Sequence, residues 1–461
     1  MTVEDVLRAT SGTLRGDDES AELAALSTDS RSTAPRDLFV ALRGDHFDGH
    51  DFVDDAIARG AAAVVCERGR ARPRRGVALV EVDDTLRALG DIAAGIRLRF
   101  DIPVVAITGS NGKTSTKEMI RSILVGEMGE TAILANEGNF NNLIGLPTTI
   151  FKMNSDHRVA VLEMGMNAPG EIGRLTEIAS PTHGLITCIG EAHLEGLGSV
   201  EGVARAKGEL FAGMGETATA LVNLDDRRVV EQARRFHGAR VGYGSGGAVR
   251  VGGIRSLGLE GSTFELQYGG ECVSVELGAP GRHNVKNALA AASVALVLGV
   301  RLDAVVRGLA GASAPPMRLQ PQRLDNGVTV INDAYNANPA SLSVALEMLR
   351  DAAASRCIVV LGEMLELGAD AVELHERAGR EAGSIDPMFF CAMGSFSGAM
   401  EKGAISAGMK ADRVRSYEDH GQLAADLARR WRSGDVILVK GSRGSAMEKV
   451  VEALELHAAR S

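Results

Sequence analysis

The chain has 461 residues, of which 45% are hydrophobic and 24% are charged, and its formal net charge is −10. This composition is typical of a globular protein, and the length predicts about three domains. The acidic net charge gives no support for nucleic acid or an anionic membrane surface as a partner.

The amino-terminal sequence and the cysteines indicate the compartment. The first residues, MTVEDVLRATSG, lack the basic and apolar regions of a signal peptide, and no apolar run reaches about 20 residues. The five cysteines are scattered and include no C-x-x-C pair, which argues against a zinc site or a redox pair. We therefore expect a cytoplasmic protein with reduced thiols and without membrane insertion.

Short β-rich runs alternate with helical patterns along the chain. Three runs lie in residues 1–84 (DLFVAL, AAVVCE, VALVEV), four in residues 85–313 (VVAITG, VAVLEMG, HGLITCIG, TALVNL) and four in residues 314–461 (VTVIND, CIVVLGEM, MFFCAMG, DVILVKGS). Helical patterns such as TLRALGDIAAGIRLRF and SLSVALEMLRDAAAS lie between them. This alternation predicts α/β domains with mostly parallel sheets, which bind ligands at the carboxyl ends of their strands.

Two stretches depart from this pattern. Residues 242–281 have short alternating runs with glycine turns, which predict a smaller β-rich insert in the central domain. The segment GASAPPMRLQPQRL, residues 311–324, is dense in proline and predicts a linker. We therefore predict a small α/β domain in residues 1–84, a central domain in residues 85–313 and a Rossmann-like domain in residues 314–461.

The central domain contains a strand-to-helix junction typical of a phosphate loop. Gly109 and Gly112 let the backbone approach a ligand, and the free N–H groups of the following helical turn attract anions. Lys113 adds a positive charge, and the Thr114 hydroxyl is suited to a magnesium ion on the phosphates. Ile107 stands where the usual first glycine would be, so an ordinary glycine turn is the alternative. The predicted ATP-binding loop comprises Gly109, Ser110, Asn111, Gly112, Lys113, Thr114 and Ser115.

Glu163 and His193 are candidates for metal binding, and Lys207 is a third residue whose environment matters. Glu163 ends an apolar strand, where a magnesium ion would offset the cost of an unpaired carboxylate; a carboxylate facing water is the alternative. His193 follows another strand between Glu191 and Glu195, which leaves a metal ligand and a structural histidine about equally open. Lys207 lies on a helical pattern, and its sequence context alone favours a solvated side chain.

Polar side chains also concentrate at turns and helix starts. Asn284 could cap a helix or bond the edge of a heterocycle. Arg318 lies in the predicted linker and is suited to reach a phosphate across a domain gap. Lys440, Ser442 and Arg443, in the turn VKGSRGS, could hold a carboxylate. Two turns carry more polar groups than a turn requires, namely NEGNFNN with Asn136, Asn139, Asn141 and Asn142, and NDAYNANP with Asp333, Tyr335, Asn336 and Asn338.

Together these motifs resemble the ATP-dependent Mur ligases of bacterial cell-wall synthesis over essentially the whole chain. TGSNGKT, without a first glycine, is that family's form of the phosphate loop. EMGMNAPGEI, GEAHLEGLGS, DAYNANP and LGEMLELG resemble the members that join D-alanyl-D-alanine to UDP-N-acetylmuramoyl-tripeptide. The resemblance implies a three-domain monomeric ligase that forms an amide through an acyl phosphate, with ATP and two Mg²⁺ ions as cofactors.

The resemblance also implies roles for single residues. Lys113 would hold the terminal phosphates of ATP, Thr114 and Glu163 would bind one Mg²⁺, and His193 would share a second. Lys207 would be carbamylated, which turns a cation into a metal ligand and reverses the solvated interpretation. The predicted catalytic residues are Lys113, Glu163, His193 and Lys207.

Nucleotide and substrate contacts follow from the same resemblance. Asn284 would contact adenine, Arg318 a phosphate, and Asp333 the nucleotide from the third domain. The segments STDSR and GDHFDGHDF would receive the uridine nucleotide, and NEGNFNN the muramoyl part. Ser445 and Ala446 depart from the bulkier residues expected beside the dipeptide pocket. The predicted substrate-binding residues are Ser30, Arg31, Asn136, Asn139, Asn141, Asn142, Tyr335, Asn336, Asn338, Lys440, Ser442 and Arg443.

Three other functions stay open at this point. A related ligase that adds the third amino acid would be expected to carry a D-N-P-R run in the last domain, which this chain lacks. A folylpolyglutamate synthetase-like ligase shares the phosphate loop but lacks a first domain of this kind. A nucleotide-binding protein without ligase activity would bind ATP and form no amide.

Overall fold

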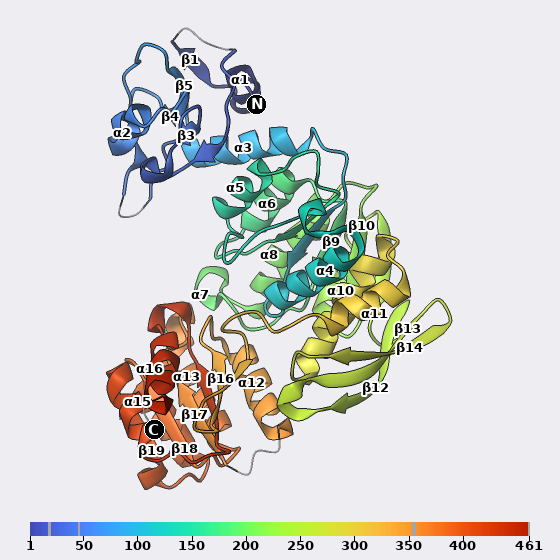
Figure 1. Cartoon of the computed structure of the whole chain (residues 1–461), viewed down its shortest axis with the longest axis vertical. Helices are drawn as coiled ribbons and strands as arrows, with labels where there is room; N and C mark the ends of the chain where they lie inside the picture. Colours follow the sequence, from blue (N-terminus) through green and yellow to red (C-terminus); the bar gives the residue numbers. More distant parts are fainter. Residues whose placement is uncertain (17–19, 45–46, 353–355, 460–461) are drawn as a thin grey trace.

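The computed structural model describes residues 1–16, 20–44, 47–352 and 356–459. They form three sheets that follow one another along the chain, and Figure 1 shows three domains arranged along the long axis of the molecule. Asp45 and His46 of the segment predicted to receive uridine lie outside the described residues, as do the last three residues of the predicted helix SLSVALEMLRDAAAS.

The first sheet has five strands in the order β1-β5-β4-β3-β2. Strands β2 to β5 are parallel, and β1 is antiparallel to β5 at one edge. All residues of β3 and β5 are buried, as expected of parallel strands that are covered on both faces. The elements are α1 (Val3–Thr10), β1 (Thr13–Arg15), β2 (Leu26–Ser27), β3 (Leu38–Val40), α2 (Val53–Ala58), β4 (Ala63–Glu67) and β5 (Ala78–Val82).

Helix α3 (Thr85–Arg97) connects the first domain to the central domain. Its buried residues Ala88 and Leu89 belong to a hydrophobic cluster that also contains Val80 of the first sheet and Val104 of the central sheet. The buried Arg97 guanidinium donates to backbone carbonyls after its own helix and at the end of α6 (Glu171–Ala179). The helix therefore packs against both domains, and the predicted boundary after residue 84 stays a prediction.

The central sheet has nine strands in the order β14-β13-β12-β11-β10-β9-β6-β8-β7. Strand β6 lies between β8 and β9 and is parallel to both. Its alternate residues enter two different hydrophobic clusters, with Val104 and Ala106 in one and Val105 and Ile107 in the other. The carboxyl end of β6, where the phosphate loop begins, is thus fixed in the middle of a sheet covered on both faces.

The segment predicted as a β-rich insert extends this sheet at one edge. Strand β12 is parallel to β11, and the β12-β13 and β13-β14 pairs are antiparallel. Figure 1 shows these strands on the side of the central domain away from the first domain. The other elements are α4 (Lys113–Met128), α5 (Gly145–Phe151), α7 (Leu194–Leu197), α8 (Val200–Gly213), α9 (Arg227–Ala233), α10 (Arg282–Val297), α11 (Leu302–Ala310), β6 (Val104–Thr108), β7 (Ile133–Ala135), β8 (Val159–Glu163), β9 (His183–Ile186), β10 (Thr219–Asn223), β11 (Ala239–Tyr243), β12 (Val249–Ser256), β13 (Ser262–Tyr268) and β14 (Glu271–Leu277).

The third sheet has the order β15-β16-β20-β17-β18-β19 and is parallel except for β15. The predicted linker ends in this sheet, because Gln320–Arg323 form the edge strand β15, a position that accommodates Pro321. Hydrophobic clusters cover both faces. The elements are β15, β16 (Thr329–Asp333), α12 (Pro339–Asp351), β17 (Cys357–Leu361), α13 (Ala371–Gly383), β18 (Phe389–Met393), α14 (Ser397–Ser406), β19 (Val414–Tyr417), α15 (His420–Ala428), β20 (Val436–Lys440) and α16 (Glu448–Ala458).

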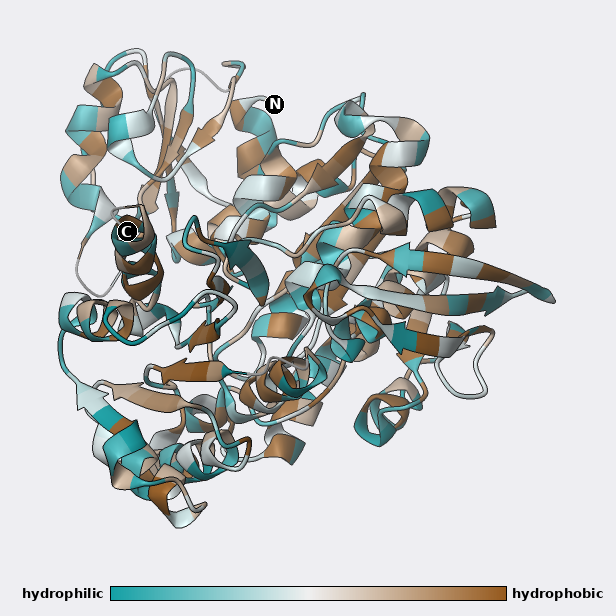
Figure 2. Cartoon of the chain, turned by 60° about the horizontal axis from the view of Figure 1, so that its bottom comes forward, coloured by the Kyte–Doolittle hydropathy of each residue, from teal (hydrophilic) through white to brown (hydrophobic). Residues whose placement is uncertain are grey.

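The hydropathy of the chain follows these layers. Figure 2 shows hydrophobic residues along many of the strands and hydrophilic residues on outer turns and helix faces. Among the described residues, no helix is long and apolar enough to span a membrane.

Candidate active site

The phosphate loop joins β6 to α4 and depends on its two glycines. Gly109 has a φ of 150° and Gly112 a φ of 81°, which side chains rarely allow. A Cβ at Gly109 would overlap the Thr187 hydroxyl, and one at Gly112 would overlap the Asn287 amide. Lys113 Nζ donates to the Gly109 carbonyl at 2.7 Å, so the lysine lies back along its own loop. Burial lowers the pKa of this lysine, and the Glu163 carboxylate opposes that shift.

Glu163 ends β8 beside the loop and is only 2% exposed. Its Oε2 accepts from the Thr114 hydroxyl at 2.8 Å, and its Oε1 accepts from the Asn141 amide at 2.8 Å. Asn136 bonds the Glu163 backbone N–H and C=O through its side chain at 2.9 Å each. Asn136 therefore lies under the loop and anchors the end of β8, whereas Asn141 contacts the carboxylate itself.

A hydroxyl and a carboxylate at a phosphate loop form a donor set that suits Mg²⁺, a hard cation that prefers oxygen ligands. Thr114 and Glu163 supply these two oxygens, already within hydrogen-bond distance of each other. Among the residues that the structure describes, no three His, Cys, Asp or Glu side chains are clustered to hold a metal by themselves. Further ligands would have to come from phosphate oxygens, from water or from a modified side chain.

Lys207 lies on α8 and is 1% exposed, so the interpretation as a solvated lysine is wrong. Its ammonium makes no hydrogen bond or ion pair with the described residues. Burial lowers the pKa of Lys207 well below its usual value, and the positive charge of Lys113 lowers it further. Lys207 lies four residues from the buried Val203 and Phe211, so the helical spacing placed it on the buried face, and only the charge of a lysine favoured the solvated interpretation.

His193 precedes α7 and contacts the third domain. Its Nδ1 lies 2.6 Å from Glu366 Oε2, and the Glu195 N–H donates to the Glu366 carbonyl at 3.2 Å. A neighbouring ion pair joins Glu191 to Arg377 of α13. The Glu191 carboxylate is thus paired across the domain boundary, whereas Glu195 crosses it through its backbone N–H alone.

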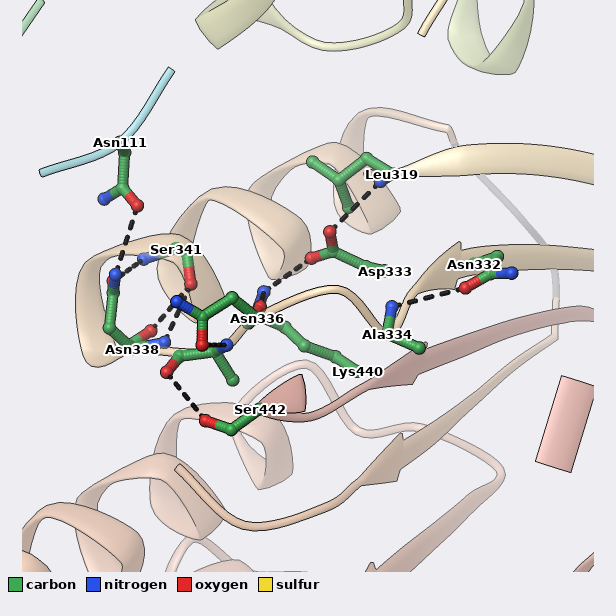
Figure 3. Close-up of polar contacts among 11 residues, drawn as sticks. Asn111, Leu319, Asn332, Asp333, Ala334, Asn336, Asn338, Ser341, Lys440 and Ser442 are labelled. Carbon is green, nitrogen blue, oxygen red and sulfur yellow. Dashed lines mark hydrogen bonds and ion pairs between the residues drawn. The ribbon is translucent and has the colours of Figure 1, made fainter. Parts of the chain in front are cut away.

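Asp333 and Lys440 form a buried ion pair at the ends of β16 and β20. Lys440 Nζ lies 2.6 Å from Asp333 Oδ2 and also donates to the Asn336 carbonyl at 3.0 Å (Figure 3). Asp333 Oδ1 accepts from the Leu319 N–H at 3.1 Å, which ties the linker to this turn. Burial raises the pKa of Asp333, and Lys440 opposes the shift.

Asn338 connects the third domain to the phosphate loop. Its Oδ1 accepts from the Ser341 N–H at 2.8 Å and so caps α12. Its Nδ2 donates to Asn111 Oδ1 of the loop at 3.2 Å (Figure 3). Ser442 supports the same turn, since its hydroxyl donates to the Ala337 carbonyl at 3.3 Å.

Arg318 is presented by an irregular stretch of backbone. Met317 and Leu319 on either side have left-handed φ angles of 56° and 48°, which are uncommon for residues with side chains. The guanidinium carbon of Arg318 lies 4.1 Å from the centre of the Tyr335 ring. Arg443, further along, is paired with Glu448 at 2.9 Å.

Asn284 and Asn287 lie at the start of α10. Asn284 Nδ2 donates to the Pro280 carbonyl at 2.8 Å, and its Oδ1 accepts from Asn287 Nδ2 at 3.1 Å. Asn287 in turn lies against Gly112 of the loop. The pair therefore positions α10 against the phosphate loop.

A cavity of about 980 Å³ joins the central and third domains. Of the predicted residues, it is lined by Ser110, Asn111, Gly112, Lys113, Thr114, Ser115, Asn139, Asn141, Asn142, Glu163, His193, Asn284, Arg318, Asp333, Tyr335, Asn336, Asn338 and Lys440. The remaining predicted residues are not in its lining. Ser30 and Arg31 lie in the first domain, where Arg31 pairs with Asp29 at 2.7 Å, and Lys207, Asn136 and Ser442 are buried beneath the surface.

Known protein families match the chain domain by domain. The Mur ligase family catalytic domain matches residues 22–97, the Mur ligase middle domain matches residues 107–295, and the Mur ligase glutamate ligase domain matches residues 317–443. The UDP-N-acetylmuramoyl-tripeptide–D-alanyl-D-alanine ligase of Bacillus subtilis is 35% identical over 457 residues, which cover 98% of each chain. This chain belongs to the Mur ligase family.

Solved structures of other Mur ligases have the same three-domain fold. MurF from Acinetobacter baumannii superposes with a TM-score of 0.90 at 31% identity, covering 99% of this Mur ligase and 98% of that chain. MurF from Thermotoga maritima in complex with ADP has a TM-score of 0.82 at 29% identity, covering 95% and 98% of the two chains. The predicted family and the predicted α/β fold class are both confirmed.

Sequence reasoning left two residues of this site without a role. Asn287 was visible only as a second amide near Asn284, and its contact with Gly112 depends on how α10 packs. Glu366 lies in LGEMLELG, shortly after the carboxyl end of β17. Because ligands bind at this end of parallel strands, its acidic side chain could have been predicted as a site residue. Its partner His193 is far away in sequence, so the pairing required the structure.

Proposed function

We propose that this Mur ligase joins D-alanyl-D-alanine to UDP-N-acetylmuramoyl-tripeptide at the expense of ATP, in peptidoglycan synthesis. Two relatives that align with this chain over 98% of their own length are named for this activity. The observation that carries the proposal is the shared cavity, in which the phosphate loop and Glu163 face the Arg318 and Asp333 region of the third domain. We propose that the enzyme acts as a monomer, as the family resemblance implies.

The reaction has two steps. The terminal carboxylate of the tripeptide attacks the γ-phosphorus of ATP, the bond to the ADP oxygen breaks, and an acyl phosphate forms. The amine of the dipeptide, after losing a proton, then attacks the acyl carbon, and phosphate leaves with the former carboxylate oxygen. The contribution of the protein is to position the reactants and to neutralise charge.

Residues around the cavity have the chemistry that these steps need. Lys113 and Arg318 are cations beside the phosphate path, and the N–H groups of the loop bind the phosphates. Thr114 and Glu163 would hold Mg²⁺, which neutralises phosphate charge when bound, and His193 would share a second ion. Water must be excluded from the acyl phosphate, which a closed arrangement of the central and third domains would achieve.

The environment of Lys207 favours the formation of a carbamate on its amine. Carbamylation needs a neutral amine, which attacks carbon dioxide and releases a proton. Burial lowers the pKa of Lys207 and so favours the neutral amine. The product is an anion with two oxygens, which suits a hard cation where an ammonium would repel it. We propose that Lys207 is carbamylated and serves as a metal ligand.

Product analysis tests this function against its alternatives. The enzyme is incubated with ATP, Mg²⁺ and UDP-N-acetylmuramoyl-tripeptide, with and without D-alanyl-D-alanine, and the products are identified by mass spectrometry. We expect the pentapeptide and ADP only when the dipeptide is present. Extension of a dipeptide precursor, glutamate addition to a folate, or ATP binding without any amide would each support one of the other functions instead.

A further inference from the structure

The pair formed by His193 and Glu366 crosses the boundary between two domains. His193 precedes α7 of the central domain, and Glu366 follows β17 of the third domain. The His193 Nδ1 and Glu366 Oε2 atoms are 2.6 Å apart. Figure 1 shows α7 on the side of the central domain that faces the third domain.

Both residues have an uncommon backbone conformation. His193 has a φ of 54° and Glu366 a φ of 61°, both in the left-handed region that non-glycine residues seldom occupy. Such conformations are unfavourable and persist where the surrounding structure fixes them, often at functional sites. The Glu195 N–H, which donates to the Glu366 carbonyl at 3.2 Å, holds the two turns together.

The hydrogen bond determines where the imidazole carries its proton. An ionised carboxylate has no proton to donate and can only accept, so the donor in the 2.6 Å contact with Glu366 is the imidazole nitrogen. Nδ1 must therefore donate, and a neutral imidazole then has a bare lone pair on Nε2. Nε2 has no hydrogen-bond partner among the described residues, and His193 lines the cavity together with Glu163 and Thr114.

We propose that Glu366 is a positioning residue, supplied by the third domain, that fixes His193 as the Nδ1–H tautomer with Nε2 free for the shared cavity. The inference rests on the proposed function, in which His193 binds a metal ion through that nitrogen. Histidine ligands almost always donate their other ring N–H to a carboxylate, a backbone carbonyl or water, which fixes the tautomer and the orientation of the ring. Here the carboxylate lies in another domain, so the ligand is completed only when the two domains are in contact.

The neighbouring pair Glu191–Arg377 supplies a matched control. It joins the same two domains, two residues along the chain from His193, and within the described part of the chain neither side chain has a hydrogen bond or ion pair with the imidazole. If Glu366 merely fastens the domains together, then removing Arg377 should have the same consequences as removing Glu366. If Glu366 positions the imidazole, only its own removal should change the state of His193.

Nitrogen NMR of the full-length protein tests the tautomer directly. Histidine is labelled with nitrogen-15, spectra are recorded at about pH 8, where imidazoles are mostly neutral, and the His193 signals are identified as those lost in His193→Gln. We expect the Nδ1–H tautomer in wild type and in Arg377→Ala, and a mixture of tautomers in Glu366→Ala. Glu366→Gln should also give a mixture, because an amide can either accept or donate. An unchanged tautomer in Glu366→Ala would overturn the proposal.

Metal binding without turnover is the second test. Mn²⁺, used in place of Mg²⁺, is titrated by electron paramagnetic resonance in the presence of ADP. We expect binding roughly 10- to 100-fold weaker in Glu366→Ala, the usual effect of removing a carboxylate behind a histidine ligand, and unchanged binding in Arg377→Ala. Equal effects in the two variants would reduce Glu366 to an interdomain contact. Failure of wild type to retain Mn²⁺ with ADP would contradict the proposed function, and the NMR result would still decide the positioning role.

Discussion

Lys207 is the residue whose surroundings change its chemistry most. An exposed lysine is a cation near neutral pH, whereas this one is enclosed, lacks a hydrogen-bond partner among the described residues and lies near the positive charge of Lys113. These conditions favour the neutral amine, which is the form that reacts with carbon dioxide. Burial, rather than any sequence motif, is therefore the physical reason to expect a modified lysine.

Replacing Lys207 should separate the possible roles of this side chain. We expect Lys207→Ala to lose most activity, because a metal ligand is removed, and we expect acetate to restore part of it by filling the vacated position. Lys207→Arg should be inactive without rescue, because its positive charge remains and its bulk fills the space. Initial rates with and without acetate measure this. Full activity of Lys207→Ala would show that no ligand is supplied here.

Tyr335 should act on the nucleotide through Arg318. Its ring supports the guanidinium at 4.1 Å, and such a contact contributes about 1 kcal/mol, or about fivefold in affinity. We expect Tyr335→Leu to weaken ADP binding by about this factor, with Tyr335→Phe close to wild type because the ring is retained. AMP, which lacks the terminal phosphate of ADP, should be affected less. Calorimetry provides the comparison, and equal losses in the Phe and Leu variants would assign the effect to the hydroxyl instead.

At the scale of elements, α12 has two separable contacts at its first turn. Asn338 caps the helix through Oδ1 and reaches the phosphate loop through Nδ2. Asn338→Ser should keep the cap and lose the interdomain bond, whereas Asn338→Ala should lose both. Since a cap contributes about 1 kcal/mol, amide exchange at the start of α12 should be about fivefold faster in the Ala variant than in the Ser variant. Hydrogen exchange with mass spectrometry measures this, and equal exchange would show that Asn338 does not cap the helix.

Strands and loops could be predicted from the sequence where a single physical requirement determines their residue types. VVAIT, VAVLE and VILVK are apolar because their strands are covered on both faces, and TGSNGKT is set by backbone geometry at the end of one of them. The short strands β2, β7 and β19 lack such a run, so the sequence did not reveal them. Strand β15 was hidden by its proline, which an edge strand tolerates.

The candidate site was predictable as a set of segments and less so as a set of contacts. Glu163 and the loop lie together because β6 and β8 are adjacent parallel strands, which no local pattern specifies. Lys440 looked like a carboxylate-binding cation, but in the structure its ammonium is paired with Asp333. Such pairings depend on strand order and domain contacts, and these are decided by the whole chain.

At the scale of the whole molecule, few polar contacts connect the catalytic parts of the central and third domains. Among the described residues these contacts are Asn111–Asn338, His193–Glu366, Glu195–Glu366, Glu191–Arg377 and Arg282–Asp351. Because interfaces of this kind permit relative motion, we expect ligands that bind both domains to shift the arrangement. Small-angle scattering should give a smaller radius of gyration with an ATP analogue and the uridine substrate than without ligands. Superimposable profiles at saturating ligand would count against domain closure.

The central claim is that one carboxylate oxygen of the tripeptide is transferred to phosphate through an acyl phosphate. The direct test uses tripeptide substrate labelled with oxygen-18 in its terminal carboxylate, together with ATP and D-alanyl-D-alanine. We expect one labelled oxygen in each phosphate released and one in each new amide, as measured by mass spectrometry. Release of unlabelled phosphate during amide formation would contradict the mechanism, because the carboxylate would then not have been phosphorylated.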